Sequence, residues 1–298
     1  MSTCDKPRAG IEWVEHASLD DLNSMGLRAT ARLLATVTDD GGLACFLQWA
    51  ESAGEDFIVL GAGTNVILAE EFLDCVIVRL DGQFAQFDLQ GEHLTAGAAA
   101  PLSALVEKTR QEGLSGLEGG WGIPGLVGGA LIGNAGASGW AIGDHVEWVE
   151  VCERSAARKR LAAAEIGFSY RKSTLANFVV TRARFVLQRA GRGSIEEVVG
   201  KAEARRSRHP RGASAGCIFK NPPGQSAGRL IDEAGLAGLH RGGAVVSAQH
   251  ANFIINEGGA TASDVLDLIE EVRCRVFERF HIQLETEVRI LSSSKLKK

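Results

Sequence analysis

A glycine-rich tract in the middle of the chain restricts the possible folds more than any other feature. Residues 119–139 read GGWGIPGLVGGALIGNAGASG, inside a longer stretch, 114–143, that has little helical or strand pattern. Paired glycines permit positive φ and let a ligand approach the backbone closely, and Pro124 favours a turn. A tract of this length in a compact domain is typically functional. The alternative is the glycine-rich start of a helix that packs against a sheet.

A second glycine-containing loop, GAGTN at residues 61–65, directly follows a predicted buried strand. Such a loop can bring successive backbone N–H groups close to an anion. It resembles the beginning of a GxGxxG dinucleotide motif, but Val66 replaces the third glycine, and ILAEEF is a poor start for a crossover helix. A tight structural turn is the alternative. Taken together, the two glycine segments are best explained by one large flat cofactor with a pyrophosphate.

The rest of the chain predicts an α+β fold. The first forty residues carry no strong periodicity. Thr261 and Asp264 are spaced as a capping box, and the apolar face of the helix that follows, which includes Phe277 and Phe280, is expected to be core. We expect helices at 43–53, 101–113, 194–210 and 261–280, and strands at 57–60, 75–80, 93–99, 146–153, 177–187, 252–256 and 286–291.

Composition and charge exclude several classes of function. The net charge of −5 gives no reason to expect nucleic acid as a partner, and no apolar run is long enough to predict a membrane span. The N-terminus lacks a hydrophobic signal core, so we expect a cytoplasmic location. The six cysteines show no CxxC pair or metal-ligand spacing, so they predict neither a metal site nor a disulfide framework. Most of them are expected to be small core residues.

Three short segments carry residues suited to chemistry: Cys217 in SAGCIFKNP, Arg171 in FSYRKS and Glu287 in LETEVRIL. Each has an ordinary alternative. Cys217 could fill the core beside a strand, Arg171 could be solvated at a strand end, and Glu287 could pair with a neighbouring arginine. None of these segments decides the function by itself.

Taken in order along the chain, these segments are similar to one family, the UDP-N-acetylenolpyruvoylglucosamine reductases of peptidoglycan synthesis, in its shorter subtype. The resemblance extends from about residue 55 to residue 291, whereas DLNSMGLRATARLLATV is a degenerate version of the family's opening segment. The number and order of the matching segments make the resemblance specific. They are GAGTN, GIPGLVGGALIGNAGA, FSYRKS, SAGCIFKNPPGQSAGRLIDEAGL, GGAVVSAQHANFIIN and LETEVRIL.

The resemblance implies an FAD-binding fold of the vanillyl-alcohol-oxidase type. Two α+β cofactor subdomains, at 1–83 and 84–192, would be followed by a C-terminal α+β substrate domain at 193–298. In this family NADPH reduces the flavin and leaves, and the enolpyruvyl sugar nucleotide then receives the hydride. The resemblance also implies the residues that contact FAD: Gly61, Ala62, Gly63, Thr64, Asn65, Gly122, Ile123, Pro124, Gly125, Gly128, Gly129, Asn134, Ala135 and Gly136.

The catalytic roles implied by the resemblance make chemical sense. Hydride addition to the enolpyruvyl double bond builds negative charge on the adjacent carboxylate, and Arg171 offers a planar cation to stabilise it. Glu287 stands at the family's catalytic carboxylate position. The proton donor is the residue after SAG, which is serine in many family members and Cys217 here. A thiol stays mostly protonated at neutral pH and can donate the same proton.

Contacts to the substrate are implied for Tyr170, Lys220, Asn221 and Arg229, with Gln249 and Asn252 as further, unranked candidates. Lys220 and Asn221 could instead cap the following helix. Two other functions stay open: an FAD-dependent oxidase or dehydrogenase of the same superfamily with another substrate, and a non-catalytic flavin-binding descendant. We expect a monomer, with a UDP-sugar and NADPH as small-molecule partners.

Overall fold

The computed structural model describes residues 6–293, and the chain divides into two compact units. The chain passes between the units several times, so each unit is assembled from segments far apart in the sequence. The predicted division at residues 83 and 192 into three consecutive domains stays a prediction. Unit 1 contains the chain up to Glu15, Leu33–Gly61 and Cys75–Arg206, and unit 2 contains His16–Arg32, Ala62–Asp74 and the chain from Ser207.

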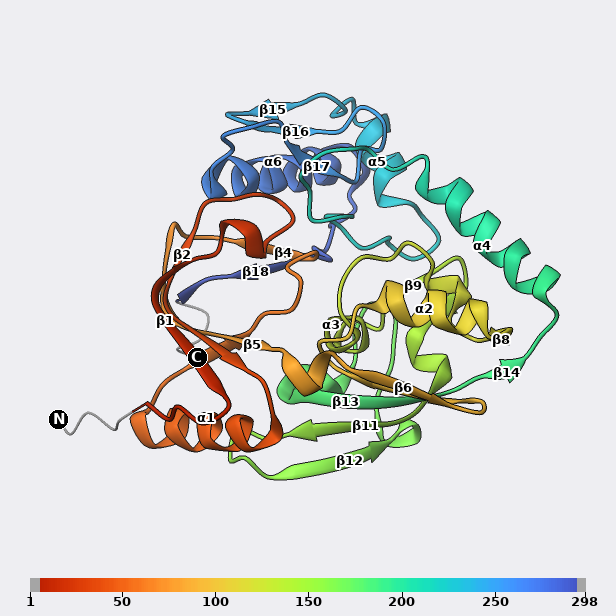
Figure 1. The fold of residues 1–298 in the computed structure, drawn as a ribbon. Coiled ribbons are helices and arrows are strands. Elements are labelled where there is room, and N and C mark those ends of the chain that lie inside the picture. The colour runs from red at the N-terminus through yellow and green to blue at the C-terminus, as the bar shows by residue number, and fades with distance from the viewer. Residues whose placement is uncertain (1–5, 294–298) are drawn as a thin grey trace. The chain divides into compact units, whose positions relative to one another are not determined.

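Most residues of a four-stranded sheet with strand order β1-β2-β5-β3 belong to unit 1. Helix α1 lies beside this sheet (Figure 1) and shares its hydrophobic cluster. The helix begins where the Asp39 carboxylate accepts a hydrogen bond from Gly42 N (2.7 Å), and it ends at Gly54, whose φ is 66°. The bounds are β1 Ile11–Ser18, β2 Thr30–Val37, α1 Asp40–Ala53, β3 Phe57–Val59 and β5 Phe72–Leu80.

Strands β1 and β2 lie in the first forty residues, where the sequence predicted no regular element. Alternate residues of β2 are buried, but Ala31 and Ala35 are two of the four. Alanine is small and depleted in strands, so its alternation is a weak signal. The periodicity is therefore present in the burial of β2 but hardly visible in its sequence.

A second sheet in unit 1 is antiparallel, with strand order β12-β11-β13-β7-β6. The predicted alternation is confirmed, because Val149 and Val151 of β11 and Ala183 and Phe185 of β13 are buried. These side chains belong to the same hydrophobic cluster as α1, so unit 1 has a continuous core. The bounds are β6 Phe87–Gln90, β7 His93–Gly97, α2 Leu102–Gln111, β11 Val146–Cys152, β12 Arg158–Ala162, β13 Val179–Val186 and α4 Arg192–Arg206.

The glycine-rich tract contains more regular structure than predicted. Helix α3, Val127–Ile132, lies within it and contacts β7 and β13. Its first turn is fixed by hydrogen bonds from Val127 N to Ala100 O (3.0 Å) and from Gly128 N to Ala98 O (2.8 Å). The alternative of a glycine-rich helix start against a sheet is thus confirmed. Short strands pair around it: β8 Leu114–Ser115 with β14 Gln188–Arg189, and β9 Gly136–Ala137 with β10 Trp140–Ala141.

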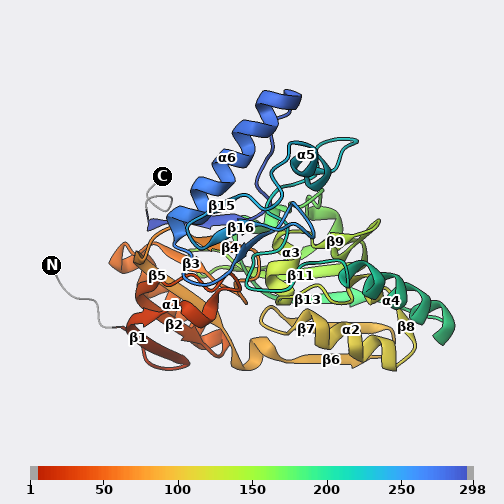
Figure 2. The ribbon, with the colours of Figure 1, turned by 90° about the horizontal axis from the view of Figure 1, so that it is seen from above.

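Unit 2 is built around helix α6, which packs against one face of a three-stranded sheet of order β15-β16-β17 (Figures 1 and 2). The predicted capping box is confirmed, because Asp264 N donates to Thr261 Oγ1 and Thr261 N donates to Asp264 Oδ2. Phe277 was wrongly assigned to the core, since it is 50% exposed. The bounds are β4 Val66–Leu68, α5 Ala227–Glu233, β15 His240–Arg241, β16 Ala244–Val246, β17 Ile254–Asn256, α6 Ala262–Phe280 and β18 Arg289–Leu291.

The remaining elements are short 3-10 helices. Of the cysteines within residues 6–293, Cys75 and Cys152 are buried as expected, Cys217 is half-buried, and Cys45 and Cys274 are exposed; Cys4 lies outside the described residues. Within residues 6–293, no helix combines the length and apolar character needed to cross a membrane. The 3-10 helices are η1 Asp20–Leu22, η2 Gly82–Ala85, η3 Glu118–Gly120, η4 Ile142–His145, η5 Ala163–Glu165 and η6 Thr174–Asn177.

Candidate active site

The GAGTN loop joins β3 to β4, so a strand stands where a Rossmann motif would begin a helix. Gly63 is buried with a φ of 64°, and a Cβ there would overlap the Leu22 carbonyl oxygen, so only glycine fits. Within residues 6–293, the N–H groups of Gly61, Ala62, Gly63 and Asn65 donate no hydrogen bond. Such amides in one loop suit an anion. The loop therefore fits a cofactor with a pyrophosphate.

Residues 19–27 hold this loop, although no role was predicted for them. The buried side chain of Asn23 donates from Nδ2 to Leu19 O (3.0 Å) and Leu27 O (2.9 Å), and its Oδ1 accepts from Leu27 N (2.9 Å). Ser24 N then donates to Gly63 O (3.1 Å). Adjacent asparagine and serine favour turns, and this was the signal that could have identified the segment.

The glycine-rich tract meets the first glycine of the GAGTN loop within unit 1. Leu102 N donates to Gly125 O (3.0 Å), which holds the tract along the residues before α2. Leu126 follows, and a Cβ built on Gly61 would lie 3.7 Å from its Cδ1. The proximity of the two segments agrees with the interpretation that they serve one ligand.

The predicted FAD contacts of this tract lie around α3. A Cβ on Gly129 would meet no atom of the described chain within 4 Å, so one side of the helix is open. The backbone before the helix depends on glycine, since φ is 71° at Gly122 and 119° at Gly125. Gly122, Ile123, Pro124 and Gly125 precede α3, Gly128 and Gly129 lie in it, and Asn134, Ala135 and Gly136 follow it.

Asn134 connects the end of α3 to the segment that carries Arg171. Its Nδ2 donates to Ser169 O (3.0 Å), and its Oδ1 accepts from Gly143 N (3.1 Å). Both ends of the amide therefore have a protein partner. The predicted contact of Asn134 with a ring edge stays a prediction.

Arg171 lies at the tip of a tight turn in unit 1. Ser169 N donates to Lys172 O (2.9 Å) and Lys172 N donates to Ser169 O (3.2 Å), which leaves Tyr170 and Arg171 at the tip. Arg171 has a φ of 56°, a conformation that costs a non-glycine residue free energy and is concentrated at functional sites. Its guanidinium lies 5.8 Å from the centre of the Tyr170 ring, and Tyr170 is 58% exposed.

Cys217 belongs to unit 2, in an extended segment that pairs antiparallel with Phe253. The thiol is half-buried and packs against Val245, Phe253 and Ile255. Ala244 and Val246, the neighbours of Val245 in β16, belong to the cluster around α6 instead. Cys217 therefore lies on the sheet face opposite α6, packed on its apolar side and still partly exposed.

Glu287 is held beside this segment by the backbone. Its N–H donates to Ile218 O over 2.7 Å. Asn65 connects residues 287–289 to the GAGTN loop, because its Nδ2 donates to Glu287 O (3.3 Å) and its carbonyl oxygen accepts from Arg289 N (3.0 Å). The structure thus brings Cys217, Glu287 and the end of the GAGTN loop together in unit 2, whereas Arg171 belongs to unit 1.

The residues predicted to contact the substrate have ordinary partners as well. Lys220 Nζ lies 3.3 Å from Glu285 Oε2, and Asn221 Oδ1 accepts from Ala227 N (2.9 Å) at the start of α5. The predicted capping alternative is therefore confirmed for Asn221. Arg229 pairs with Glu233 (2.6 Å) on the surface of α5. Contact of these side chains with a substrate stays a prediction.

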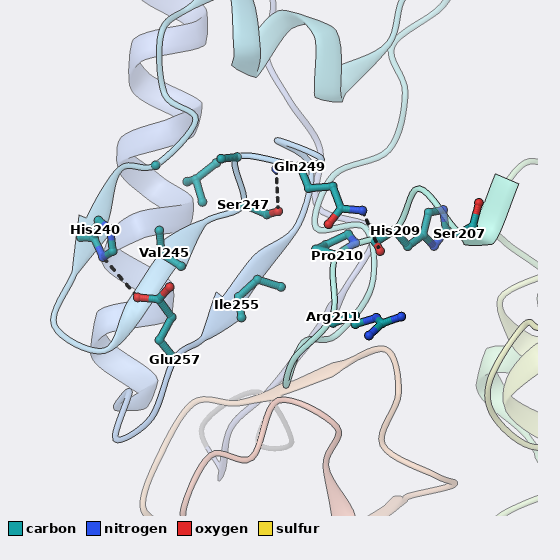
Figure 3. A pocket seen from close by; sticks show the side chains of 13 residues that line it. Ser207, His209, Pro210, Arg211, His240, Val245, Ser247, Gln249, Ile255 and Glu257 are labelled. Carbon is teal, nitrogen blue, oxygen red and sulfur yellow. Dashed lines mark hydrogen bonds and ion pairs between the residues drawn. The ribbon is translucent and has the colours of Figure 1, made fainter. Parts of the chain in front are cut away.

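A pocket of about 500 Å³ opens on the Cys217 face of the β15-β16-β17 sheet (Figure 3). Val245 and Ile255, from the cluster against which Cys217 packs, are part of its lining. Gln249 closes one side by donating from Nε2 to His209 O (3.2 Å). Several lining residues lie in the segment GGAVVSAQHANFIIN, but only Gln249 among them was a candidate for substrate contact, because the lining is completed by residues from other segments such as His209 and Arg211.

Comparison with known proteins gives a consistent family. Residues 208–291 match the family model described as UDP-N-acetylenolpyruvoylglucosamine reductase, C-terminal domain, and residues 31–158 match the one described as FAD binding domain. The UDP-N-acetylenolpyruvoylglucosamine reductase of Heliobacterium modesticaldum is 38% identical over 288 residues, covering 95% of this chain and 92% of that protein. The chain belongs to the UDP-N-acetylenolpyruvoylglucosamine reductase family.

Solved structures agree with this family and with the predicted fold. The crystal structure of UDP-N-acetylenolpyruvylglucosamine reductase from Thermus caldophilus matches with a TM-score of 0.82 and 40% identity, covering 94% of this chain and 98% of that chain. The 6-hydroxy-D-nicotine oxidase of Arthrobacter nicotinovorans, at 16% identity and a TM-score of 0.50 over 97% of this chain and 63% of that one, shares the fold alone. The α+β FAD-binding fold of the vanillyl-alcohol-oxidase type is thereby confirmed.

Proposed function

We propose that this member of the family is an FAD-dependent enzyme that uses NADPH to reduce UDP-N-acetylglucosamine enolpyruvate to UDP-N-acetylmuramate, a precursor of peptidoglycan. The hydrogen bond from Glu287 N to Ile218 O supports this most strongly. It keeps the candidate carboxylate and the candidate thiol on neighbouring extended segments. The reaction needs those two groups to act on the same substrate.

FAD would be held by the backbone amides of the GAGTN loop and by the tract around α3. The amides of Gly61, Ala62, Gly63 and Asn65 suit its pyrophosphate, and the open side of α3 at Gly129 leaves room for a flat ring. When bound, FAD supplies the carrier that passes hydride from NADPH to the substrate.

Arg171 would stabilise the charge that develops on the substrate carboxylate. A guanidinium matches a carboxylate with two parallel hydrogen bonds. The turn between Ser169 and Lys172 fixes the backbone of Arg171 before the substrate arrives. Pre-organisation of this kind makes a cation effective in the transition state.

Cys217 would give its thiol proton to the substrate carbon that bears the carboxylate. That carbon becomes electron-rich when hydride adds to its neighbour, so one proton completes the new C–H bond, and solvent then reprotonates the thiolate. Glu287 would orient the reacting group. Tyr170, Lys220, Asn221 and Arg229 would contact the rest of the UDP-sugar.

An anaerobic titration of the purified holoprotein tests the proposal. NADPH should bleach the flavin absorbance, and one equivalent of the enolpyruvyl sugar nucleotide should restore it with formation of UDP-N-acetylmuramate. A flavin that NADPH bleaches, but that the sugar nucleotide leaves bleached, would rule out this substrate. A reduced flavin that reoxidises equally fast with plain UDP-N-acetylglucosamine would also contradict the proposal.

A further inference from the structure

The segment that carries Cys217 depends on one buried side chain, that of Asn252. Phe219 N donates to Asn252 Oδ1 (2.9 Å), and Asn252 Nδ2 donates to Phe219 O (2.8 Å). The backbone carbonyl of Asn252 also accepts from Ile218 N (2.8 Å). Asn252 is 3% exposed and Phe219 is 2% exposed. These buried peptide groups therefore rely on Asn252, since water does not reach them.

The match between these groups is specific to an amide. A side-chain amide offers a donor and an acceptor side by side, as a peptide group does, so it can satisfy both the N–H and the C=O of one residue. An aspartate of the same size only accepts, and a leucine does neither. Asn252 was a candidate for substrate contact, but both ends of its side chain are engaged within the protein.

The pairing of Asn252 with Phe219 involves the segment that carries Cys217 and contacts Glu287. Phe219 is two residues after Cys217, and Phe253, the neighbour of Asn252, pairs with Cys217 itself. On its other side, the same segment accepts the Glu287 N–H through Ile218 O. We propose that Asn252 is a positioning residue for the proton-transfer step, acting through Phe219 to hold Cys217 in register with Glu287. This inference rests on the proposed function.

The test compares the two half-reactions of the holoenzyme by anaerobic stopped-flow absorbance. In Asn252→Asp at pH 8, flavin reduction by NADPH should stay within about twofold of wild type, while reoxidation by the enolpyruvyl sugar nucleotide should slow roughly tenfold or more. A loss of stability alone would not divide the half-reactions in this way. Equal rates in both half-reactions, or equal losses in both, would overturn the proposal.

Lowering the pH should restore flavin reoxidation in Asn252→Asp. A protonated carboxyl has one O–H donor and one acceptor, like the amide it replaces, and burial raises the pKa of a carboxyl. The ratio of variant to wild-type reoxidation should therefore rise toward one between pH 8 and pH 6. Dividing by wild type at each pH cancels the pH effects that both proteins share, and Asn252→Leu is the comparison for effects of the nearby His250, Cys217 and Glu287 that arise from changing residue 252. Asn252→Leu, which cannot be rescued, should give a low ratio at every pH, and rescue of this variant too would contradict the inference.

Asn256, at the end of β17, provides a matched control. Its Nδ2 donates to Met25 O (3.0 Å) and its Oδ1 accepts from Gly258 N (2.9 Å), so Asn256→Asp makes the same chemical change away from Phe219. We expect this variant to reoxidise within about threefold of wild type. An effect as large as that of Asn252→Asp would reduce Asn252 to a general structural role.

A second measurement does not depend on the reaction. The rate at which iodoacetamide alkylates Cys217, followed by mass spectrometry, should rise at least threefold in Asn252→Asp and Asn252→Leu because the segment loosens. The exposed Cys45 and Cys274 are internal references whose rates should not change. If wild-type flavin is not reoxidised by the sugar nucleotide, the proposed function fails, whereas unchanged alkylation of Cys217 defeats the positioning role by itself.

Discussion

Ser24 Oγ donates a hydrogen bond to the carbonyl oxygen of Ser214 over 2.7 Å, although the residues are 190 positions apart in the chain. Ser24 Oγ also lies 3.2 Å from the carbonyl oxygen of Gly63, and that carbonyl accepts a hydrogen bond from Ser24 N over 3.1 Å. All three residues belong to unit 2. One serine therefore ties the predicted pyrophosphate loop to the segment that leads to Cys217.

Removing this hydroxyl should weaken cofactor binding. In Ser24→Ala we expect the dissociation constant of FAD to rise about three- to tenfold, the equivalent of one hydrogen bond, while Ser24→Thr should bind like wild type. Thr109→Val is a matched control, because Thr109 Oγ1 donates to Val106 O (3.0 Å) inside α2. Ser24→Ala and Thr109→Val should each lose a few degrees in Tm. Thr109→Val should nevertheless keep its FAD affinity, measured by flavin fluorescence. Equal affinities in all variants would exclude this role for Ser24.

Alanine substitutions at Gly63 and at Gly91 distinguish the cost of steric overlap from the cost of backbone strain. Both have φ near 63°, but a Cβ on Gly63 overlaps the Leu22 carbonyl, whereas a Cβ on Gly91 meets no atom within 4 Å. Gly91→Ala should cost about 1–2 kcal/mol of unfolding free energy from conformation alone. Gly63→Ala should cost about 3 kcal/mol or more and lose FAD. Urea denaturation measures both, and similar losses would show that the GAGTN loop tolerates movement.

The positive φ of Arg171 predicts that Arg171→Gly and Arg171→Ala differ in stability although both lose activity. Glycine adopts this conformation without strain, so Arg171→Gly should be about 1 kcal/mol more stable than Arg171→Ala. Both variants lose the guanidinium and should reoxidise reduced flavin at least a hundredfold more slowly with the sugar nucleotide. Thermal unfolding and stopped-flow absorbance test the two parts. A more stable alanine variant would argue against backbone strain at this turn.

The histidines His145 and His250 should make the fold sensitive to mild acid. Burial is the main cause that lowers the pKa of each imidazole from its ordinary value of 6.5. The unfolded chain therefore binds protons more readily, so stability is fully present above about pH 6.5 and is lost as the pH falls through the lowered values. Tm should drop between pH 7.5 and pH 5.5, and His145→Gln should drop less. An identical slope in that variant would exclude His145 as a contributor.

The long amphipathic elements could be predicted from the sequence because their periodicity is carried by large side chains. Helix α6 is an example, with Val265, Leu268 and Val272 on its buried face. Strand β2 was missed because alanines occupy half of its buried positions. Phe277 was placed in the core by spacing alone, yet it is 50% exposed, whereas Val276 beside it is fully buried, so Phe277 lies at the edge of the apolar face of α6.

The candidate site likewise has parts that could be predicted from the sequence and parts that could not. GAGTN and SAGC are each a single continuous segment, so a candidate role for each could be predicted from the sequence. The contacts that hold them, from Ser24 to Ser214 and from Asn252 to Phe219, join residues distant in the chain. No local pattern encodes such pairs, since each side chain acts through the backbone of its partner. For the same reason, Asn252 was interpreted as a possible substrate contact rather than as support for Cys217.

The rate of flavin reoxidation in Cys217 variants tests the central claim most directly. After anaerobic reduction by NADPH, which should be equally fast in every variant, the enolpyruvyl sugar nucleotide should reoxidise the wild type and Cys217→Ser. In Cys217→Ala the same step should slow by about 10²–10⁴-fold, the usual contribution of a positioned proton donor. Reoxidation of Cys217→Ala at the wild-type rate would contradict the account and leave Cys217 as a packing residue against Val245, Phe253 and Ile255.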